Sequence, residues 1–304
     1  MEKQLKIGKT SLIECKTLYE KYRLQAHIFV KAEYENAGGS IKDRVAKAII
    51  EDAEQKGLLK KGGCVVEATS GNTGIGLALV SKSKGYKAVI FMPSTMSKER
   101  QDLIASYGGE VRLTDGEKGM QGAVEEAQVF VRENDNCIFA GQFDNPVCVS
   151  AHYDSTAPEI VAALNGKTDI IVVAVGTGGT LTGISKYCKE KNPSTRVVAV
   201  EPSASPLLSK GYAGKHGIQG IGANFIPSIL DRNAYDEVQT VTEEEAFSWA
   251  KVLRETEKIN AGISSGASLC VAMRLAMQEE NAGKNIVVIL PDGADRYASV
   301  PNFL

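Results

Sequence analysis

Short, continuous runs of apolar residues alternate along this chain with longer segments in which apolar positions recur at helical spacing. The runs predict buried strands over residues 26–31, 64–68, 88–92, 111–113, 170–175, 197–200 and 285–290. The helical spacing predicts helices over residues 12–22, 41–53, 97–107, 119–133, 157–164, 243–255 and 269–278. One further helix ends near residue 84, and another begins at residue 181. Residues 201–230 are dense in Gly, Ser and Pro and predict a loop-rich segment.

The alternation of strands and helices determines the expected fold class. Each predicted strand is a Val/Ile-rich run, which is typical of parallel strands that helices cover on both faces. We therefore expect an α/β fold of two doubly wound domains with largely parallel sheets, divided into residues 1–150 and 151–304. Ligands of such sheets bind at the carboxyl ends of the strands, so the glycine-rich loops between strands and helices are the candidate sites.

Composition and charge exclude several classes of function. The 304 residues are 43% hydrophobic and 24% charged, which is ordinary for a globular protein in water. Lys and Arg number 35 against 37 Asp and Glu, without a long run of either sign, which argues against nucleic-acid and membrane partners. No apolar run reaches membrane-spanning length, and the first six residues lack the apolar core of a signal peptide. We expect a cytoplasmic protein.

The cysteines and histidines do not predict a metal site. The six cysteines are scattered, without a Cys-x-x-Cys pair or a nearby histidine, at Cys15, Cys64, Cys137, Cys148, Cys188 and Cys270. Only three histidines are present. We expect buried, reduced thiols rather than a disulfide framework.

The first candidate site is Lys42, which follows the sequence Asn36-Ala37-Gly38-Gly39-Ser40. The glycines permit a backbone turn, and Ser40 with Asp43 has the spacing of a reciprocal helix cap. Lys42 then lies in the first helical turn, where the helix dipole favours the free amine that Schiff-base chemistry requires. The alternative is a capped surface helix with a solvated lysine.

The second candidate site, Gly176-Thr177-Gly178-Gly179-Thr180, follows a predicted strand and begins a helix. Its glycines expose consecutive amides at the positive end of that helix, and its threonines add hydroxyl donors, which suits a phosphate group. Leu181 stands where the dinucleotide pattern Gly-x-Gly-x-x-Gly requires glycine, so a single phosphate is favoured over a dinucleotide. The alternative is a tight turn that lets the helix pack closely on the sheet.

The third candidate site, Thr69-Ser70-Gly71-Asn72-Thr73, also begins a helix. Its hydroxyl and amide side chains and free N–H groups suit a small carboxylate, such as that of an amino acid. The alternative is a helix cap with surplus donors. A serine-rich sequence, Gly262-Ile263-Ser264-Ser265-Gly266-Ala267-Ser268, precedes another helix but is weak evidence alone.

Together these sequences resemble the cysteine synthase family, which comprises O-acetylserine sulfhydrylase and its relatives among the fold-type II (β-family) pyridoxal-phosphate enzymes, including cystathionine β-synthase-like proteins. The resemblance runs from Ile7 to Tyr297, with the motifs in the family's order and spacing. It implies a tryptophan synthase β-like fold with the active site in a cleft between the two domains. It also implies that the first 35 residues pack on the C-terminal domain.

The resemblance implies roles for individual residues. Lys42 carries pyridoxal 5′-phosphate as a Schiff base and Asn72 hydrogen-bonds the cofactor's ring oxygen. The cofactor's phosphate is held by Gly176, Thr177, Gly178, Gly179 and Thr180. Its pyridine nitrogen is met by Ser265, with Ser264 the weaker candidate. The substrate carboxylate is received by Thr69, Ser70, Gly71, Asn72, Thr73 and Gln142, and Ser70 is also assigned to catalysis.

The implied reaction is a β-replacement through an α-aminoacrylate, in which O-acetyl-L-serine and sulfide give L-cysteine and acetate and Lys42 is the general base. A serine opposite the pyridine nitrogen makes the ring a weaker electron sink than a carboxylate would, which suits β-elimination better than transamination. One alternative consumes cysteine or serine instead, as a sulfide-releasing cysteine lyase or a lanthionine- or cystathionine-forming enzyme. Another is a non-catalytic binding protein, against which the presence of Lys42 argues.

The chain departs from the family pattern at positions close to the implied nucleophile. Ser70 favours the sulfhydrylase branch, because cystathionine-forming relatives often carry alanine there. Sulfhydrylases usually have glycine at position 224, where cystathionine-forming and cysteine-consuming relatives often have an acid. Asn224 has the bulk of that acid without its charge, so it either contacts the incoming nucleophile or only fills the loop. Cys148 replaces the family's usual asparagine near the pocket entrance.

The resemblance also bears on partners. It implies a homodimer that acts in cysteine biosynthesis and sulfur metabolism, with serine acetyltransferase as a possible partner. We expect no regulatory domain after Leu304 and no haem segment before the fold.

Overall fold

The computed structural model describes residues 5–303, which fold into two compact units. Unit 1 comprises residues 5–7 and Asn36–Cys148, and unit 2 comprises Gly8–Glu35 and residues 149–303. Each unit is an α/β structure whose sheet is largely parallel, so the predicted fold class is confirmed.

Unit 1 is built on a four-stranded parallel sheet in the order β5-β4-β3-β6. Its strands are β3 (Cys64–Ala68), β4 (Lys87–Pro93), β5 (Gly109–Thr114) and β6 (Cys137–Phe139). All of β3 and all of β4 except Lys87 are buried, as expected of parallel strands covered on both faces.

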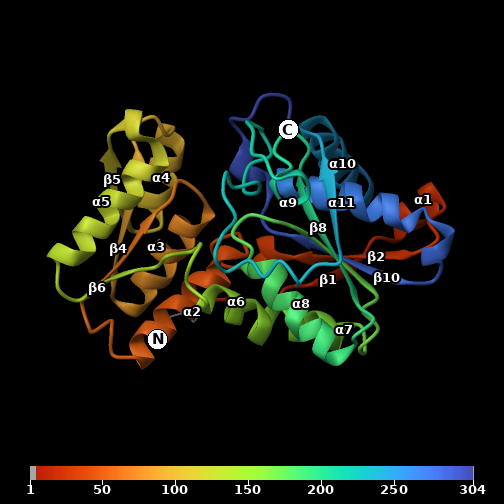
Figure 1. The fold of residues 1–304 in the computed structure, drawn as a ribbon, viewed down its shortest axis with the longest axis horizontal. Helices are drawn as coiled ribbons and strands as arrows, with labels where there is room; N and C mark the ends of the chain where they lie inside the picture. The colour runs from red at the N-terminus through yellow and green to blue at the C-terminus, as the bar shows by residue number, and fades with distance from the viewer. Residues whose placement is uncertain (1–4, 304) are drawn as a thin grey trace. The chain divides into compact units, whose positions relative to one another are not determined.

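Helices cover both faces of this sheet (Figure 1). They are α3 (Asn72–Lys84), α4 (Lys98–Ser106) and α5 (Gly119–Glu133). Helix α2 (Lys42–Gln55) packs against α3, and the short α6 (Val147–Ala151) leads out of unit 1. On one face Val66 and Phe91 pack with Ala123 of α5. On the other face, Gly74 of α3 lies so close to Ile90 that an added Cβ would be 3.2 Å from its side chain.

Unit 2 is built on a six-stranded sheet in the order β1-β2-β10-β7-β8-β9. Its strands are β1 (Leu12–Glu14), β2 (His27–Ala32), β7 (Ile170–Ala174), β8 (Arg196–Pro202), β9 (Glu237–Val241) and β10 (Asn285–Leu290). Only the pairing of β1 with β2 is antiparallel. Figure 1 shows β2, from the start of the chain, beside β10 from its end.

The helices of unit 2 include one that is almost completely buried. They are α1 (Lys16–Tyr22), α7 (Ala157–Ala163), α8 (Gly179–Lys191), α9 (Leu207–Lys210), α10 (Glu243–Glu257) and α11 (Ile263–Ala276), with a π-helical turn at His152–Thr156. Every residue of α11 except Arg274 is buried, because α10 covers the side of α11 that does not face the sheet. This packing holds the serines at the start of α11 inside the unit.

Some local predictions are wrong. Residues 12–14 form a strand instead of the start of a helix, and the helix begins at Lys16. Ser40 and Asp43 do not form the predicted reciprocal cap, because α2 has Ile41 at its N-cap and no side-chain cap bond. The Asp43 carboxylate instead accepts a hydrogen bond from the Gly38 amide (2.5 Å).

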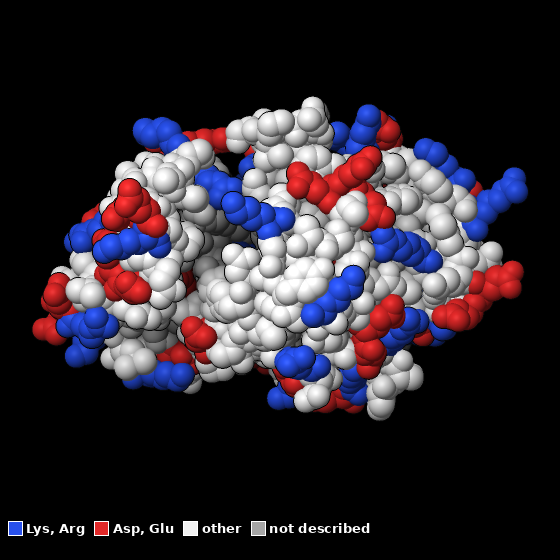
Figure 2. Space-filling model, turned by 45° about the horizontal axis from the view of Figure 1, so that its top comes forward, with Lys and Arg blue, Asp and Glu red and all other residues white. Residues whose placement is uncertain are grey.

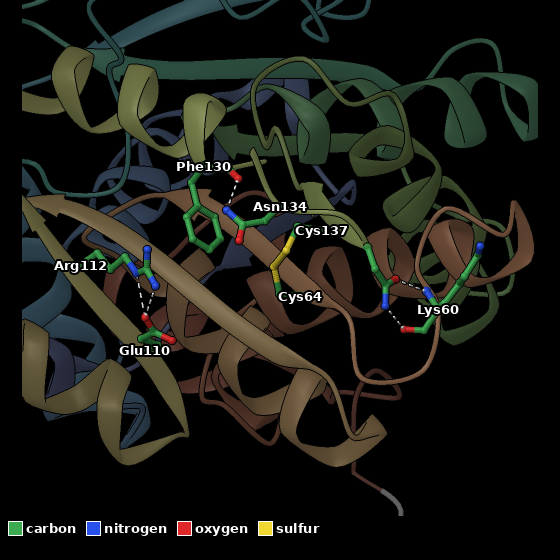
Figure 3. The surroundings of a disulfide bond; sticks show 8 residues. Lys60, Cys64, Glu110, Arg112, Phe130, Asn134 and Cys137 are labelled. Carbon is green, nitrogen blue, oxygen red and sulfur yellow. Dashed lines mark hydrogen bonds and ion pairs between the residues drawn. A yellow bond between two sulfur atoms is a disulfide. The ribbon is translucent and has the colours of Figure 1, made fainter. Parts of the chain in front are cut away.

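A disulfide joins two of the cysteines that were expected to be reduced thiols. Cys64 and Cys137 are Cα partners, 4.5 Å apart, in the parallel pairing of β3 with β6, and their sulfurs are bonded (Figure 3). The four other cysteines are buried free thiols, as the sequence predicts, at Cys15, Cys148, Cys188 and Cys270. The bond was not foreseeable because 73 residues separate its partners, and only the strand register brings them together.

Charged residues of both signs are interspersed over the face drawn in Figure 2, in keeping with the near-balance of Lys and Arg against Asp and Glu. None of the helices within residues 5–303 has the length and apolar character needed to cross a membrane. The same residues contain no group of three or more His, Cys, Asp and Glu side chains arranged to hold a metal ion.

Candidate active site

Lys42 is the first residue of α2, and its side chain is half-buried. Its backbone N–H donates to Ser40 Oγ (3.2 Å), so Ser40 fixes the entry into the helix although it is not the N-cap. Further along, Val45 and Ile49 are buried and hold the helix in place. The start of α2 also lies against α3, since a Cβ on Gly76 would be 3.1 Å from the carbonyl oxygen of Lys42.

The Thr69–Thr73 loop leads from β3 into α3, whose N-cap is Gly71. The Gly71 amide donates to Thr69 Oγ1 (3.2 Å), and Arg100 donates to Ser70 Oγ (3.2 Å). Thr73 Oγ1 donates to Gln142 Oε1 at 2.6 Å, which brings Gln142 onto the loop across 69 residues of sequence. The N–H groups at the start of α3 carry the positive end of the helix dipole, so this loop can hold a carboxylate.

Glu67 lies immediately before this loop and was not singled out from the sequence. Its side chain is 2% exposed, and its two oxygens accept from the amides of Ala68 (2.8 Å) and Gln142 (3.0 Å). Burial raises the pKa of Glu67 to about 7, although hydrogen bonds from Gln142, Ala68 and Gly141 act in the opposite direction. An acidic residue inside an otherwise apolar strand was the signal that could have marked it.

Cys148 is buried and interacts electrostatically with both Lys42 and Glu67. Burial raises the pKa of its thiol to about 11, the positive charge of Lys42 lowers it and the carboxylate of Glu67 raises it further. The thiol is therefore neutral near pH 7 and is not an activated nucleophile.

The Gly176–Thr180 loop of unit 2 joins β7 to α8, which begins at Gly179. Gly178 has a φ of +86°, and an added Cβ would lie 2.6 Å from Leu230 Cβ, so only glycine fits there. Thr180 Oγ1 lies 3.2 Å from Nε2 of the buried His152, whose Nδ1 is 3.0 Å from Thr156 Oγ1. His152 thus orients a threonine of this loop, although no local sequence pattern marks this histidine. The N–H groups at the start of α8 lie at the positive end of the helix dipole and suit a phosphate.

Ser265 lies in the first turn of α11 and is completely buried. Its hydroxyl oxygen has no hydrogen-bond partner among residues 5–303. A buried hydroxyl normally has one, so an orphaned donor here fits a ring nitrogen supplied by a bound cofactor. Ser264 is also buried, and Asn224 is exposed in the loop that follows α9.

The structure therefore places the predicted residues in two groups. In unit 1, Lys42 packs against Gly76 of α3, the helix that follows the Thr69–Thr73 loop, and Thr73 of that loop is hydrogen-bonded to Gln142. Unit 2 holds the Gly176–Thr180 loop, Ser265 and Asn224. An amine at a helix start, a glycine loop at a second helix start and an orphaned serine are the groups that pyridoxal phosphate requires, so the residues present fit this cofactor.

Comparisons with known proteins agree with this fit. Residues 3–292 match the family model described as pyridoxal-phosphate dependent enzyme, and the chain belongs to this family. It is 44% identical over 296 residues to a cysteine synthase of Staphylococcus aureus (strain N315), covering 97% of this chain and 94% of the relative.

Solved structures are similar over nearly the whole chain. A cysteine synthase of Entamoeba histolytica has a TM-score of 0.93 at 42% identity and covers 98% of this chain and 88% of its own. A hydrogen sulfide-producing enzyme of Fusobacterium nucleatum has a TM-score of 0.89 at 41% identity and covers 96% of this chain and 97% of its own.

Proposed function

We propose that the chain is a cysteine synthase, which replaces the acetoxy group of O-acetyl-L-serine with sulfide and so produces L-cysteine and acetate. The observation that carries this proposal is the placement of Lys42 against α3, whose first residues and Gln142 offer donors for an amino-acid carboxylate. The curated relatives that are similar over nearly the full chain are cysteine synthases, which supports the same reaction.

The cofactor is pyridoxal 5′-phosphate. In this proposal the Lys42 amine holds it covalently, Asn72 hydrogen-bonds its ring oxygen, the Gly176–Thr180 loop holds its phosphate and Ser265 meets its pyridine nitrogen. When bound, the cofactor supplies an electron sink that acidifies the Cα proton of the amino acid. The neutral hydroxyl of Ser265 stabilises positive charge on the ring less than a carboxylate would, which favours elimination at Cβ.

The remaining roles belong to side chains of unit 1. The Thr69 hydroxyl, the Gln142 amide and the first N–H groups of α3 bind the substrate carboxylate and so orient the Cα–H bond. Thr73 contributes through Gln142, because its hydroxyl donates to Gln142 Oε1. The ε-amine of Lys42 removes the Cα proton and later returns it to the product, a general-base contribution of typically ~10²–10⁴-fold. Ser70 lies in the same loop, and in this proposal it takes part in catalysis together with Lys42.

A second candidate function is sulfide release from cysteine, with serine or a thioether as the other product. The observation that favours it is the similarity, at 41% identity, to a structure described as a hydrogen sulfide-producing enzyme. Asn224, which replaces the glycine of sulfhydrylases in an exposed loop, is the residue we connect with this choice.

The purified holoenzyme tests both functions. With O-acetylserine and sulfide, we expect cysteine and acetate in equal amounts. With cysteine alone, a cysteine synthase releases sulfide more slowly than it makes cysteine from O-acetylserine and sulfide. Rapid sulfide release from cysteine, together with slow cysteine synthesis, would favour the second candidate. Absence of both reactions would contradict the proposed chemistry.

We further propose a homodimer located in the cytoplasm, with serine acetyltransferase as a possible partner. The family resemblance supports these proposals. Sedimentation of the holoenzyme alone and with the acetyltransferase tests the two assemblies, and a monomeric sedimentation coefficient would contradict the first.

A further inference from the structure

We propose that Glu67 is a positioning residue whose carboxylate fixes Gln142 against the Thr69–Thr73 loop and thereby sets the affinity for the substrate carboxylate. The inference rests on the proposed function, since it deepens the account of how that loop receives an amino acid. Glu67 acts through Gln142 and does not touch the substrate.

Hydrogen bonds connect β3 with the segment that follows β6. The Ala140 amide still donates to the Val66 carbonyl (2.8 Å), as in a parallel pair, but the chain then turns away from β3. The Gln142 amide instead donates to the side chain of Glu67 at 3.0 Å. The carboxylate therefore takes the place of main-chain acceptors at the point where the pairing stops.

The chemistry requires a carboxylate at this position. Two backbone N–H groups, those of Ala68 and Gln142, donate to its two oxygens, one to each, and an ionised carboxylate only accepts hydrogen bonds. A glutamine would turn its NH₂ group toward one of these donors. Glu67 is only 2% exposed, and burying an acidic group costs free energy. A valine at position 67 would make this buried strand more stable. Its presence points to a role other than stability.

The consequence reaches the substrate site through Gln142. The main chain of Gln142 is held by Glu67, and its side-chain oxygen accepts from Thr73 Oγ1 at 2.6 Å. With the oxygen engaged, the amide presents its N–H donors to an incoming carboxylate. Loss of the Glu67 contact releases the Gln142 backbone and moves those donors, while the cofactor loop of unit 2 is untouched.

The test is the Glu67→Gln holoenzyme. We expect the KM for O-acetylserine to rise about tenfold, because a factor of this size corresponds to the loss of one charge-assisted hydrogen bond. The KM for sulfide, kcat and the absorbance of the bound cofactor should change little. The matched control is Glu201→Gln, because Glu201 is also 2% exposed and also accepts from backbone amides, those of Leu208 and Ser209 in unit 2. That variant should keep the wild-type KM.

A pH profile separates positioning from a merely structural role. The wild-type KM should rise as the pH falls through about 7, because a protonated carboxyl accepts one N–H group fewer. The acid Asp144 and the thiol Cys148 also interact electrostatically with Glu67, and Lys42 acts on Cys148. These groups remain in Glu67→Gln. If the KM of that variant no longer depends on pH, the pH dependence of the wild-type KM is assigned to Glu67.

Two results would overturn the inference: an unchanged KM in Glu67→Gln, or equal changes in Glu67→Gln and Glu201→Gln. If Glu67→Gln does not fold, Glu67→Asp keeps the charge but withdraws it from Gln142 and should show the same selective rise in the KM for O-acetylserine.

If the wild type does not convert O-acetylserine, the proposed function fails by itself. The Kd of L-serine, followed by the cofactor absorbance, then compares the same variants, and equal Kd values would contradict the positioning role.

Discussion

Gly76 lies directly against the backbone of Lys42. A Cβ at position 76 would be 3.1 Å from the Lys42 carbonyl oxygen and 3.3 Å from the Cβ of Ala46. Helix α3, which carries the loop for the substrate carboxylate, therefore packs against the first turn of α2 without an intervening side chain. The position of the reactive amine relative to that loop depends on this contact.

Gly76→Val tests the contact. The branched side chain cannot enter the space without moving Lys42, so we expect a stability loss of about 1–3 kcal/mol and a larger fractional loss of kcat than of cofactor binding. Urea unfolding and steady-state kinetics of the holoenzyme measure the two effects. Ser83→Val, at an exposed position of the same helix, is the control and should retain kcat. A Gly76→Val enzyme with wild-type kcat would contradict the account.

The raised pKa of Glu67 predicts how stability changes with pH. Between pH 4.5, the ordinary value, and about 7, the folded state keeps a proton that the unfolded state has released. The free energy of unfolding should therefore decrease with rising pH in this window, by up to about 3 kcal/mol from this group. Above pH 7 the contribution is constant.

The measurement is chemical denaturation of wild type and Glu67→Gln from pH 4.5 to 8. The difference between the two free energies should follow the titration of one group. Parallel stability curves for the two proteins would show that Glu67 has an ordinary pKa.

The disulfide between Cys64 and Cys137 predicts a defined thiol count. Denatured without reductant, the chain should expose four reactive thiols, and after reduction it should expose six. In the chain-entropy view, closing a loop of 73 residues stabilises the fold by about 4 kcal/mol. Reductant should therefore shift urea unfolding of the wild type to lower concentration but not that of a Cys64→Ala, Cys137→Ala double variant. Six reactive thiols before reduction would rule the bond out.

Asn224→Gly tests the choice of nucleophile. If Asn224 restricts the site, glycine should raise turnover of O-acetylserine with sulfide relative to sulfide release from cysteine, by about tenfold or less. Asn233→Gly, at another exposed asparagine of unit 2, is the matched control. An unchanged ratio of the two rates would remove Asn224 from specificity.

Much of the fold was predictable because its strands are buried on both faces. The Val/Ile runs of β3, β4, β7, β8 and β10 carry an unambiguous signal, and the structure confirms them. Strand β9 was missed because it lies at the edge of its sheet and four of its five residues are only partly buried. Strand β6 was missed because it has three residues, none fully buried.

The candidate site was predictable where chemistry sits at a strand-to-helix junction. Lys42 and the loops at Thr69–Thr73 and 176–180 have local signals, since glycines and hydroxyl residues before a helix create donors. Contacts between distant segments were not predictable. The bond from Thr73 to Gln142, the Glu67 contact and the pairing of His152 with Thr180 depend on strand register and helix packing.

The most direct test of the central claim locates the covalent bond to the cofactor. The holoenzyme is reduced with borohydride, digested and mapped by mass spectrometry. We expect the pyridoxyl group on the peptide that contains Lys42, and we expect Lys42→Ala to fold but to lack both the adduct and β-replacement activity. A pyridoxyl group on another lysine, or retained turnover in Lys42→Ala, would contradict the account.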